Sequence, residues 1–125
     1  MFTDNSAGME NNKSLTLDDK VLLCDGDDYR LVKLGDVRLF ETCGNYTKTY
    51  YKGGKMLIYR TLSYLDERLP KEYFFRANRQ YIVNLSSVHQ VKVNGSSTLS
   101  IEMECGKVIA LSRRRSQEFK GLMSL

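Results

Sequence analysis

The amino-acid sequence predicts a mainly β domain with two short helices. Short runs rich in β-branched and aromatic residues start about every 8–12 positions in the first half of the chain, at 20–24, 29–34, 37–42, 46–51 and 55–60. The segments between them, DGDD, LGD, CGN and KGG, have the composition of turns. Three further runs follow at 87–93, 98–104 and 107–111. Asn94 and Gly95, between the first two of these, predict a hairpin because both residue types tolerate positive φ.

Two segments break the strand pattern and predict helices. The first begins after Thr61, a residue type that caps helices, and its leucines recur at helical spacing up to Leu69. Pro70 stops it. Ser112 is predicted to cap the second helix, whose apolar stripe comprises Phe119, Leu122 and Met123.

Length and composition fit a single domain. The chain has 125 residues, of which 42% are hydrophobic and 27% charged. Residues 1–14 lack periodicity and are predicted to form a disordered tail or the remnant of a linker, followed by one domain over 15–125. No apolar run approaches the roughly 20 residues that a bilayer requires, and the first residues lack the apolar core of a signal peptide. We therefore expect a cytoplasmic protein without a membrane partner.

The residue patterns give no support for catalysis, a cofactor or a metal. The sequence contains no nucleophile elbow, Walker loop or HExxH motif, and DGDD at 25–28 lacks the glutamate that ends a calcium loop. Cys24, Cys43 and Cys105 are an odd number without a CxxC pair, so we expect buried, reduced thiols. The single histidine, His89, lies on a predicted strand and is expected to be structural.

Positive charge is concentrated in the second half of the chain. Residues 1–70 hold 10 Lys+Arg against 11 Asp+Glu, whereas residues 71–125 hold 9 against 4. The basic half contains Arg76 and Arg79 within FFRANRQYIVN, and the run RRR at 113–115. Arginine, asparagine and glutamine are residue types that bind phosphate and base edges. Composition alone leaves two readings open, an anionic partner or a basic face that is merely solvated.

Three motifs resemble those of the LytTR DNA-binding domain, a common output domain of bacterial response regulators. They are ETCGNY at 41–46, FRANRQYIVN at 75–84 and IALSRRR at 109–115, and they occur in the family's order. The resemblance extends from about Leu17 to Met123. It implies an elongated arrangement of antiparallel β-sheets. In that family, loops at the sheet edges, rather than a recognition helix, enter successive major grooves of double-stranded DNA at direct repeats.

The resemblance also implies a set of DNA contacts, carried over by motif. These are Tyr46, Thr47, Lys48, Asn78, Arg79, Arg113 and Arg114. Arg79 is expected to read bases, whereas Arg76 either contacts DNA or braces the loop through backbone carbonyls. Arg115 is expected to turn away, and the loop 94–97 is a weaker candidate for phosphate contact. Asn84 is expected to hold a turn. The residues assigned to the core are Phe40, Tyr59, Phe74, Phe75, Tyr81 and Ile82.

The function implied by the resemblance is a sequence-specific transcription regulator, not an enzyme. It would act as the output domain of a two-component response regulator at promoter direct repeats. A homodimer on DNA and a receiver domain in a longer protein are both compatible with it. The alternative is a small β-rich protein-interaction module with a solvated basic face.

Overall fold

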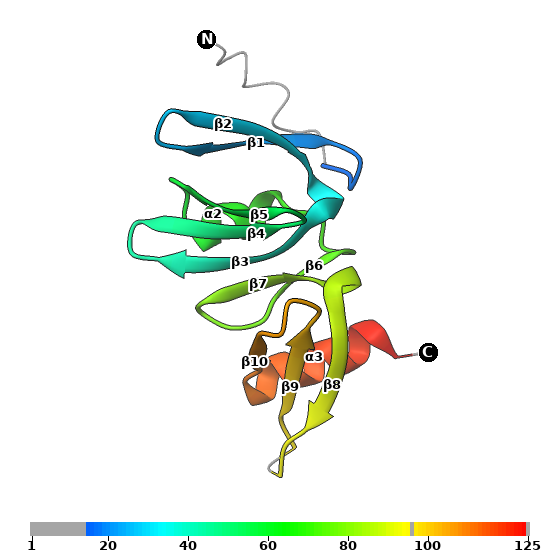
Figure 1. The fold of residues 1–125 in the computed structure, drawn as a ribbon. Coiled ribbons are helices and arrows are strands. Elements are labelled where there is room, and N and C mark those ends of the chain that lie inside the picture. The colour runs from blue at the N-terminus through cyan, green and yellow to red at the C-terminus, as the bar shows by residue number, and fades with distance from the viewer. Residues whose placement is uncertain (1–14, 96, 125) are drawn as a thin grey trace.

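The computed structural model describes residues 15–95 and 97–124, which fold into three antiparallel sheets and two helices (Figure 1). The tail predicted at 1–14 lies outside the described residues. In chain order the elements are β1 (Lys20–Asp25), β2 (Asp28–Lys33), a 3₁₀ turn (Leu34–Asp36), β3 (Val37–Cys43), β4 (Tyr46–Tyr51), β5 (Gly54–Ile58), α2 (Leu62–Arg68), β6 (Phe74–Arg76), β7 (Tyr81–Asn84), a 3₁₀ turn (Leu85–Ser87), β8 (Val88–Val93), β9 (Leu99–Met103), β10 (Val108–Ala110) and α3 (Arg113–Met123). None of the helices in these residues is long and apolar enough to cross a membrane.

A five-stranded sheet forms the centre of the molecule, with strand order β5-β4-β3-β7-β6. The β1-β2 hairpin lies on one side of it, and the three-stranded sheet β10-β9-β8 lies on the other (Figure 1). The sheets follow one another along the long axis of the molecule. This arrangement confirms the predicted mainly β fold of elongated antiparallel sheets with two short helices.

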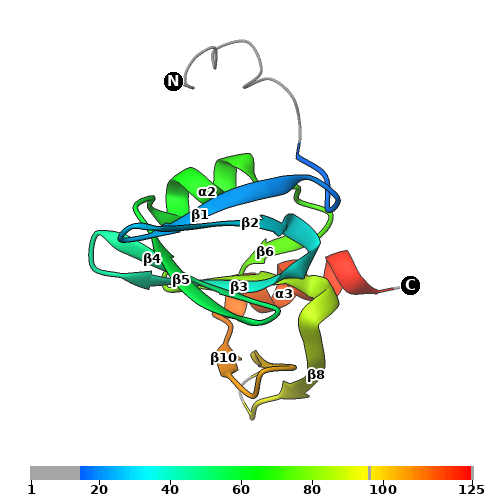
Figure 2. The same cartoon turned by 45° about the horizontal axis from the view of Figure 1, so that its top comes forward.

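Two hydrophobic cores flank the central sheet, because successive side chains of a strand point to opposite faces. The first core joins the sheet to the β1-β2 hairpin and α2, and its buried residues are Leu23, Val32, Leu34, Val37, Phe40, Met56, Leu62, Leu65, Leu69, Phe74 and Ile82. The second joins it to the small sheet and α3, and its buried residues are Leu39, Phe75, Ala77, Val83, Leu99, Ile101, Met103, Ile109, Leu111 and Phe119. Figure 2 shows the two helices on opposite sides of the central sheet.

Both helices begin at the predicted caps. The Thr61 hydroxyl accepts a hydrogen bond from the Tyr64 backbone N–H at 3.1 Å, and the Ser112 hydroxyl accepts one from the Arg115 N–H at 3.1 Å. The apolar stripe predicted for the second helix is wrong at its end. Phe119 is buried, but Leu122 and Met123 are 47% and 51% exposed.

Ser116 takes an inward position on α3 that no apolar residue fills. Its side chain is fully buried, and its hydroxyl accepts from the Leu99 N–H at 2.9 Å and donates to the Ser112 carbonyl at 2.7 Å. These two bonds satisfy a polar group that would otherwise be costly to bury. The bond from Leu99 also fixes the helix against β9.

Two further expectations about burial are wrong. Tyr59, assigned to the core, is 68% exposed because β5 ends one residue earlier. Cys43 and Cys105 are free and exposed, because Cys43 is the last residue of β3 and Cys105 lies in the β9-β10 turn, and only Cys24 is partly buried. Asn84 behaves as expected of a turn residue. Its side-chain Oδ1 accepts from the Ser86 N–H at 2.9 Å, while its side-chain Nδ2 donates to the Val37 carbonyl at 2.8 Å.

Candidate nucleic-acid interface

Three segments that carry the predicted contacts reach the same edge of the molecule, on the left of Figure 1. They are the β3-β4 turn, the loop between β6 and β7, and the start of α3. Hydrogen bonds tie the β6-β7 loop to β3, which leads into the turn, and to β10, which precedes α3. The Thr42 N–H donates to the Gln80 carbonyl at 2.9 Å, and the Asn78 amide donates to the Ala110 carbonyl at 2.9 Å. The tertiary structure therefore assembles one continuous edge from residues that lie far apart in sequence.

The β3-β4 turn presents Tyr46 at this edge. Gly44 has φ of 64°, a left-handed conformation that glycine adopts without strain. Tyr46 is 46% exposed, and its ring packs against the Tyr59 ring with the centroids 5.1 Å apart. Lys48 lies on the opposite face of β4 from Thr47, directly across from Glu41 on β3, and is half-buried.

Thr47 does not reach the edge, which corrects the prediction that it contacts DNA. Its side chain is 0% exposed and belongs to the inward row of β4 together with Thr49. The Thr47 hydroxyl donates to the Arg60 carbonyl at 2.5 Å. Strand alternation places the hydroxyl inside, where it holds the segment that follows β5.

Arg76 braces the loop between β6 and β7. Its Nε donates to the Asn78 carbonyl at 2.7 Å, and its Nη2 donates to the Arg79 carbonyl at 3.2 Å. Of the two roles considered for Arg76, the structure shows the brace. The Arg79 side chain is exposed and makes no hydrogen bond or ion pair within the described part of the chain. Its backbone is fixed while its guanidinium is available.

The Asn78 side chain forms most of its hydrogen bonds within the same loop. Its Oδ1 accepts from the Gln80 N–H at 2.8 Å and the Tyr81 N–H at 3.0 Å, and its amide nitrogen donates to the Ala110 carbonyl. Both oxygen lone pairs and one of the two amide hydrogens are thereby used. One N–H remains for a ligand, so the residue serves first to shape the loop and tie it to β10.

The start of α3 presents two arginines. Arg113 and Arg114 are exposed, and neither forms an ion pair with another described residue. Arg115 instead pairs with Glu118, with Nη1 and Oε1 at 2.9 Å, and its side chain is 28% exposed. This pairing engages the Arg115 guanidinium, and the expectation that Arg115 turns away from DNA stays a prediction. The weaker candidate loop, 94–97, lies at the tip of the β8-β9 hairpin, and its residue 96 is outside the described residues.

The half-buried carboxylate of Glu41 connects the strands from which these segments extend. Glu41 accepts hydrogen bonds from the Tyr50 hydroxyl at 2.7 Å and the Tyr81 hydroxyl at 3.0 Å, and lies 3.8 Å from Lys107 Nζ. Burial alone would raise the pKa of Glu41, but the two phenols and the nearby lysines together lower it. Burial and the bond to Glu41 raise the pKa of Tyr50 and of Tyr81. The cluster links β3, β4 and β7 to the β9-β10 turn.

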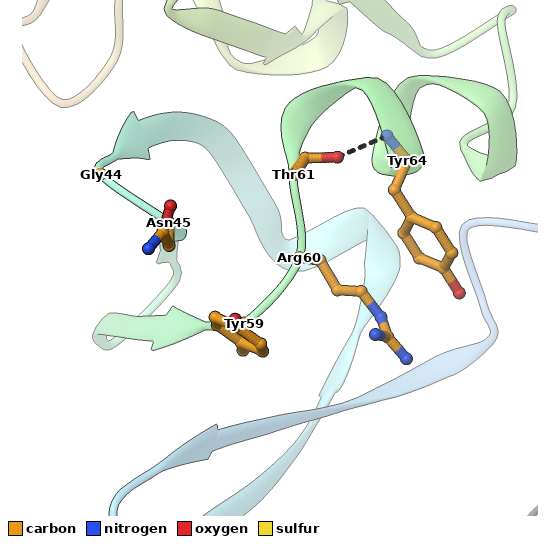
Figure 3. Close-up of a pocket in the computed structure, with 6 residues that line it drawn as sticks. All are labelled: Gly44, Asn45, Tyr59, Arg60, Thr61 and Tyr64. Carbon is orange, nitrogen blue, oxygen red and sulfur yellow. Dashed lines mark hydrogen bonds between the residues drawn. The ribbon is translucent and has the colours of Figure 1, made fainter.

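A hollow of about 350 Å³ lies beside the β3-β4 turn. The residues that line it are Gly44, Asn45, Tyr59, Arg60, Thr61 and Tyr64 (Figure 3). The Arg60 guanidinium carbon is 4.7 Å from the centre of the Tyr64 ring. Nothing in the sequence motifs predicted this group. Its one signal is the pair Tyr59-Arg60 placed between the end of a strand run and a helix cap.

A family model described as the LytTr DNA-binding domain matches residues 27–124. The chain belongs to the LytTR DNA-binding domain family. Two curated relatives, both named sensory transduction protein LytT, come from Bacillus anthracis and Bacillus cereus and are each 25% identical over 112 residues. The alignments cover 90% of this chain but 42% of each relative, so the chain spans less than half of their length.

A solved structure has the same fold. It is described as the LytTr DNA-binding domain of a methyl-accepting/DNA response regulator from Bacillus cereus. The TM-score is 0.76 at 23% sequence identity, and the match covers 85% of this chain and 97% of that one. The LytTR fold expected from the three motifs is therefore confirmed.

Within this LytTR domain, the predicted contact residues fall into three groups. Tyr46, Arg79, Arg113 and Arg114 are exposed at one edge, and Lys48 is half-buried behind it. Asn78 braces a loop, and Thr47 is buried. The sequence analysis missed two groupings, the Glu41 cluster and the hollow around Arg60, although Glu41, Tyr81, Gly44 and Asn45 lie within the motifs.

Proposed function

We propose that this LytTR domain is the DNA-binding output domain of a bacterial transcription regulator of the two-component type. It binds promoter direct repeats in double-stranded DNA through its edge loops and reads bases in the major groove. The observation that carries this proposal is the exposure of Arg79, Arg113 and Arg114 along one edge without carboxylate partners among the described residues. Membership of a DNA-binding family supports DNA as the partner.

Arg79 is assigned the base-reading role. Its planar fork can donate to guanine O6 and N7 together, which contributes about 1–3 kcal/mol of discrimination against a wrong base. The loop that carries it is already ordered by Arg76 and Asn78. Less conformational entropy is then lost on binding. Arg113 and Arg114 are assigned to phosphates and neighbouring bases, with Tyr46 and Lys48 at the other end of the edge.

The proposal also covers the full-length protein and the number of copies that bind DNA. We assign residues 15–125 to the DNA-binding unit, acting in the cytoplasm without a cofactor, with a receiver domain in the full-length protein. The length of the curated relatives supports additional domains, because the match covers 42% of each of them. Two copies would occupy the two halves of a direct repeat.

A specific observation favours a second function, contact with another protein. Leu22 and Leu31 lie opposite each other on the β1-β2 hairpin and are 55% and 62% exposed, next to Tyr29 at 66%. Exposed apolar side chains grouped in this way are typical of interaction surfaces. The basic edge would then be merely solvated.

Titration of a labelled mixed-sequence duplex at several salt concentrations distinguishes the two functions. DNA binding through several phosphate contacts predicts a steep loss of affinity with salt, with a slope of about 0.9 per contact on logarithmic axes. Selection of bound sequences from a random duplex pool would then give the site and repeat spacing. Absence of binding at low salt would contradict the DNA-binding proposal and leave the protein-contact function.

A further inference from the structure

A surface rich in aromatic and arginine side chains adjoins the candidate DNA edge. We call it the Arg60 surface, and define it as Tyr46, Tyr59, Arg60 and Tyr64. Its three tyrosines are 46%, 68% and 39% exposed. Tyr46 and Tyr59 pack against each other at 5.1 Å, and Arg60 lies over Tyr64 at 4.7 Å. Large exposed rings grouped with an arginine are typical of binding surfaces rather than of solvated ones.

The positive charge at this surface is not balanced by the nearby described carboxylates. Arg68 also lies over the Tyr64 ring, 5.7 Å from its centre, so two guanidinium groups share one ring. The three ion pairs found in the described residues involve neither arginine. The ring attracts both cations but does not neutralise them. The surface therefore favours an anionic ligand.

Arg60 is held from its backbone while its side chain is exposed. Its carbonyl accepts the Thr47 hydroxyl at 2.5 Å, and the next residue, Thr61, caps α2. Figure 3 shows the Arg60 side chain lying beside Tyr64. Because the backbone and the ring already position the guanidinium, binding an anion would require little additional ordering.

The surface is continuous with the β3-β4 turn. Gly44 and Asn45 line the same hollow as Arg60, and the Tyr46 ring joins the two regions through Tyr59. A ligand in the hollow would therefore lie next to any ligand of Tyr46. A duplex bound at Tyr46, as in the proposed function, would bring its phosphates next to the hollow, and this adjacency favours DNA over a separate anionic protein as the ligand.

We propose that the Arg60 surface binds the phosphate backbone of the duplex beyond the base-reading loops, as a contact independent of base sequence. Arg60 donates to a phosphate oxygen, and the tyrosine rings pack against the sugar-phosphate chain. This inference rests on the proposed function. It adds an anchor on one flank of the site, formed by Tyr59, Arg60 and Tyr64, which lie outside the motifs, next to Tyr46, which lies in one of them.

The test compares Arg60→Ala with Lys33→Ala on a mixed-sequence duplex. Lys33 is an exposed cation at the end of the hairpin opposite its turn, so the control removes the same charge away from the edge. We expect Arg60→Ala to lower the logarithmic salt slope by about 0.9, one phosphate contact, and Lys33→Ala to leave it unchanged. The hydrogen bond to Thr47 uses the Arg60 backbone carbonyl, so the variant keeps it.

Two further measurements make the outcome decisive. Arg60→Ala should weaken binding to a selected site and to its scrambled version by the same factor. Shortening the duplex at the end that contacts Arg60 should make wild type and Arg60→Ala bind equally. Shortening it at the other end should leave their difference in affinity. An unchanged slope in Arg60→Ala, with wild-type binding intact, would overturn this inference and point to a protein ligand for the surface. Failure of the wild-type domain to bind any duplex would instead contradict the proposed function.

Discussion

The β6-β7 loop and the β3-β4 turn reach the same edge but present their side chains by different means. In the loop, side chains build the conformation, since Arg76 and most of the Asn78 amide are used in hydrogen bonds, while the Arg79 guanidinium is left available. In the turn, the alternation of side chains along β4 decides which residue is exposed, since Tyr46 faces outward and Thr47 is buried. A polar residue in a recognition motif can therefore support the loop or strand that carries it, as Asn78 and Thr47 do, and the local backbone determines which residues are exposed.

The largest effect expected on binding is that of Arg79→Ala. Loss of a bidentate base contact should reduce affinity for a selected site by roughly tenfold to a hundredfold, while affinity for a scrambled duplex falls only slightly. The free energy of unfolding should change by less than about 0.5 kcal/mol, because the side chain is exposed. Fluorescence titration and urea denaturation measure the two quantities. Equal losses on both duplexes would rule out base reading by Arg79.

Asn78→Ala should affect stability as well as binding. It removes three hydrogen bonds and leaves loop N–H groups and the Ala110 carbonyl without this partner, which should cost about 1–3 kcal/mol of unfolding free energy. Asn78→Asp is the matched variant, because an aspartate oxygen can still accept from the Gln80 and Tyr81 N–H groups, while the donor to the Ala110 carbonyl is lost. Its stability should fall between wild type and Asn78→Ala. Wild-type stability in both variants would show that Asn78 does not brace the loop.

Thr47→Val should lower the unfolding free energy by about 1 kcal/mol, because the Arg60 carbonyl loses its hydroxyl donor. The matched control is Thr49→Val on the same strand. Thr49 is equally buried, and its hydroxyl has no hydrogen-bond partner among the described residues. That substitution should therefore be neutral or stabilising. Thermal denaturation of the pair checks the prediction, and equal effects would remove the structural role assigned to Thr47.

The smallest effect, a change in the acid dependence of stability, is expected at Glu41, which connects the strands from which the loop and the turn extend. Its folded-state pKa is lowered below the ordinary value of 4.5, so its stabilising contribution is present above that pH and is lost as the pH falls through the folded pKa. Glu41→Gln should flatten this acid response, and Tyr50→Phe should reduce it because a phenol donor is lost. Urea denaturation at a series of acidic pH values measures the response. An acid response equal to that of wild type in Glu41→Gln would contradict this role.

Much of the fold followed from local patterns. Strand runs, turn compositions and the caps Thr61 and Ser112 placed most elements to within one or two residues, because caps and turns depend on near neighbours. The same patterns failed for Tyr59, Leu122 and Met123. These side chains are exposed because Tyr59 follows the end of β5, and Leu122 and Met123 lie at the end of α3. Burial depends on what lies across from a residue, and local sequence does not contain that information.

The sequence by itself determined the β-rich class, the family and the exposed arginines, because composition, turn chemistry and three ordered motifs are properties of the chain. Only the tertiary structure decided which polar residues remain available. Asn78 bonds to Ala110, which is 32 residues away, and Thr47 on β4 bonds to Arg60, which follows the neighbouring strand β5. The Glu41 cluster and the Arg60 surface likewise form only when separate strands and turns meet. A hydrogen bond requires both partners within about 3 Å, and for residues distant in sequence the folded chain alone sets that distance.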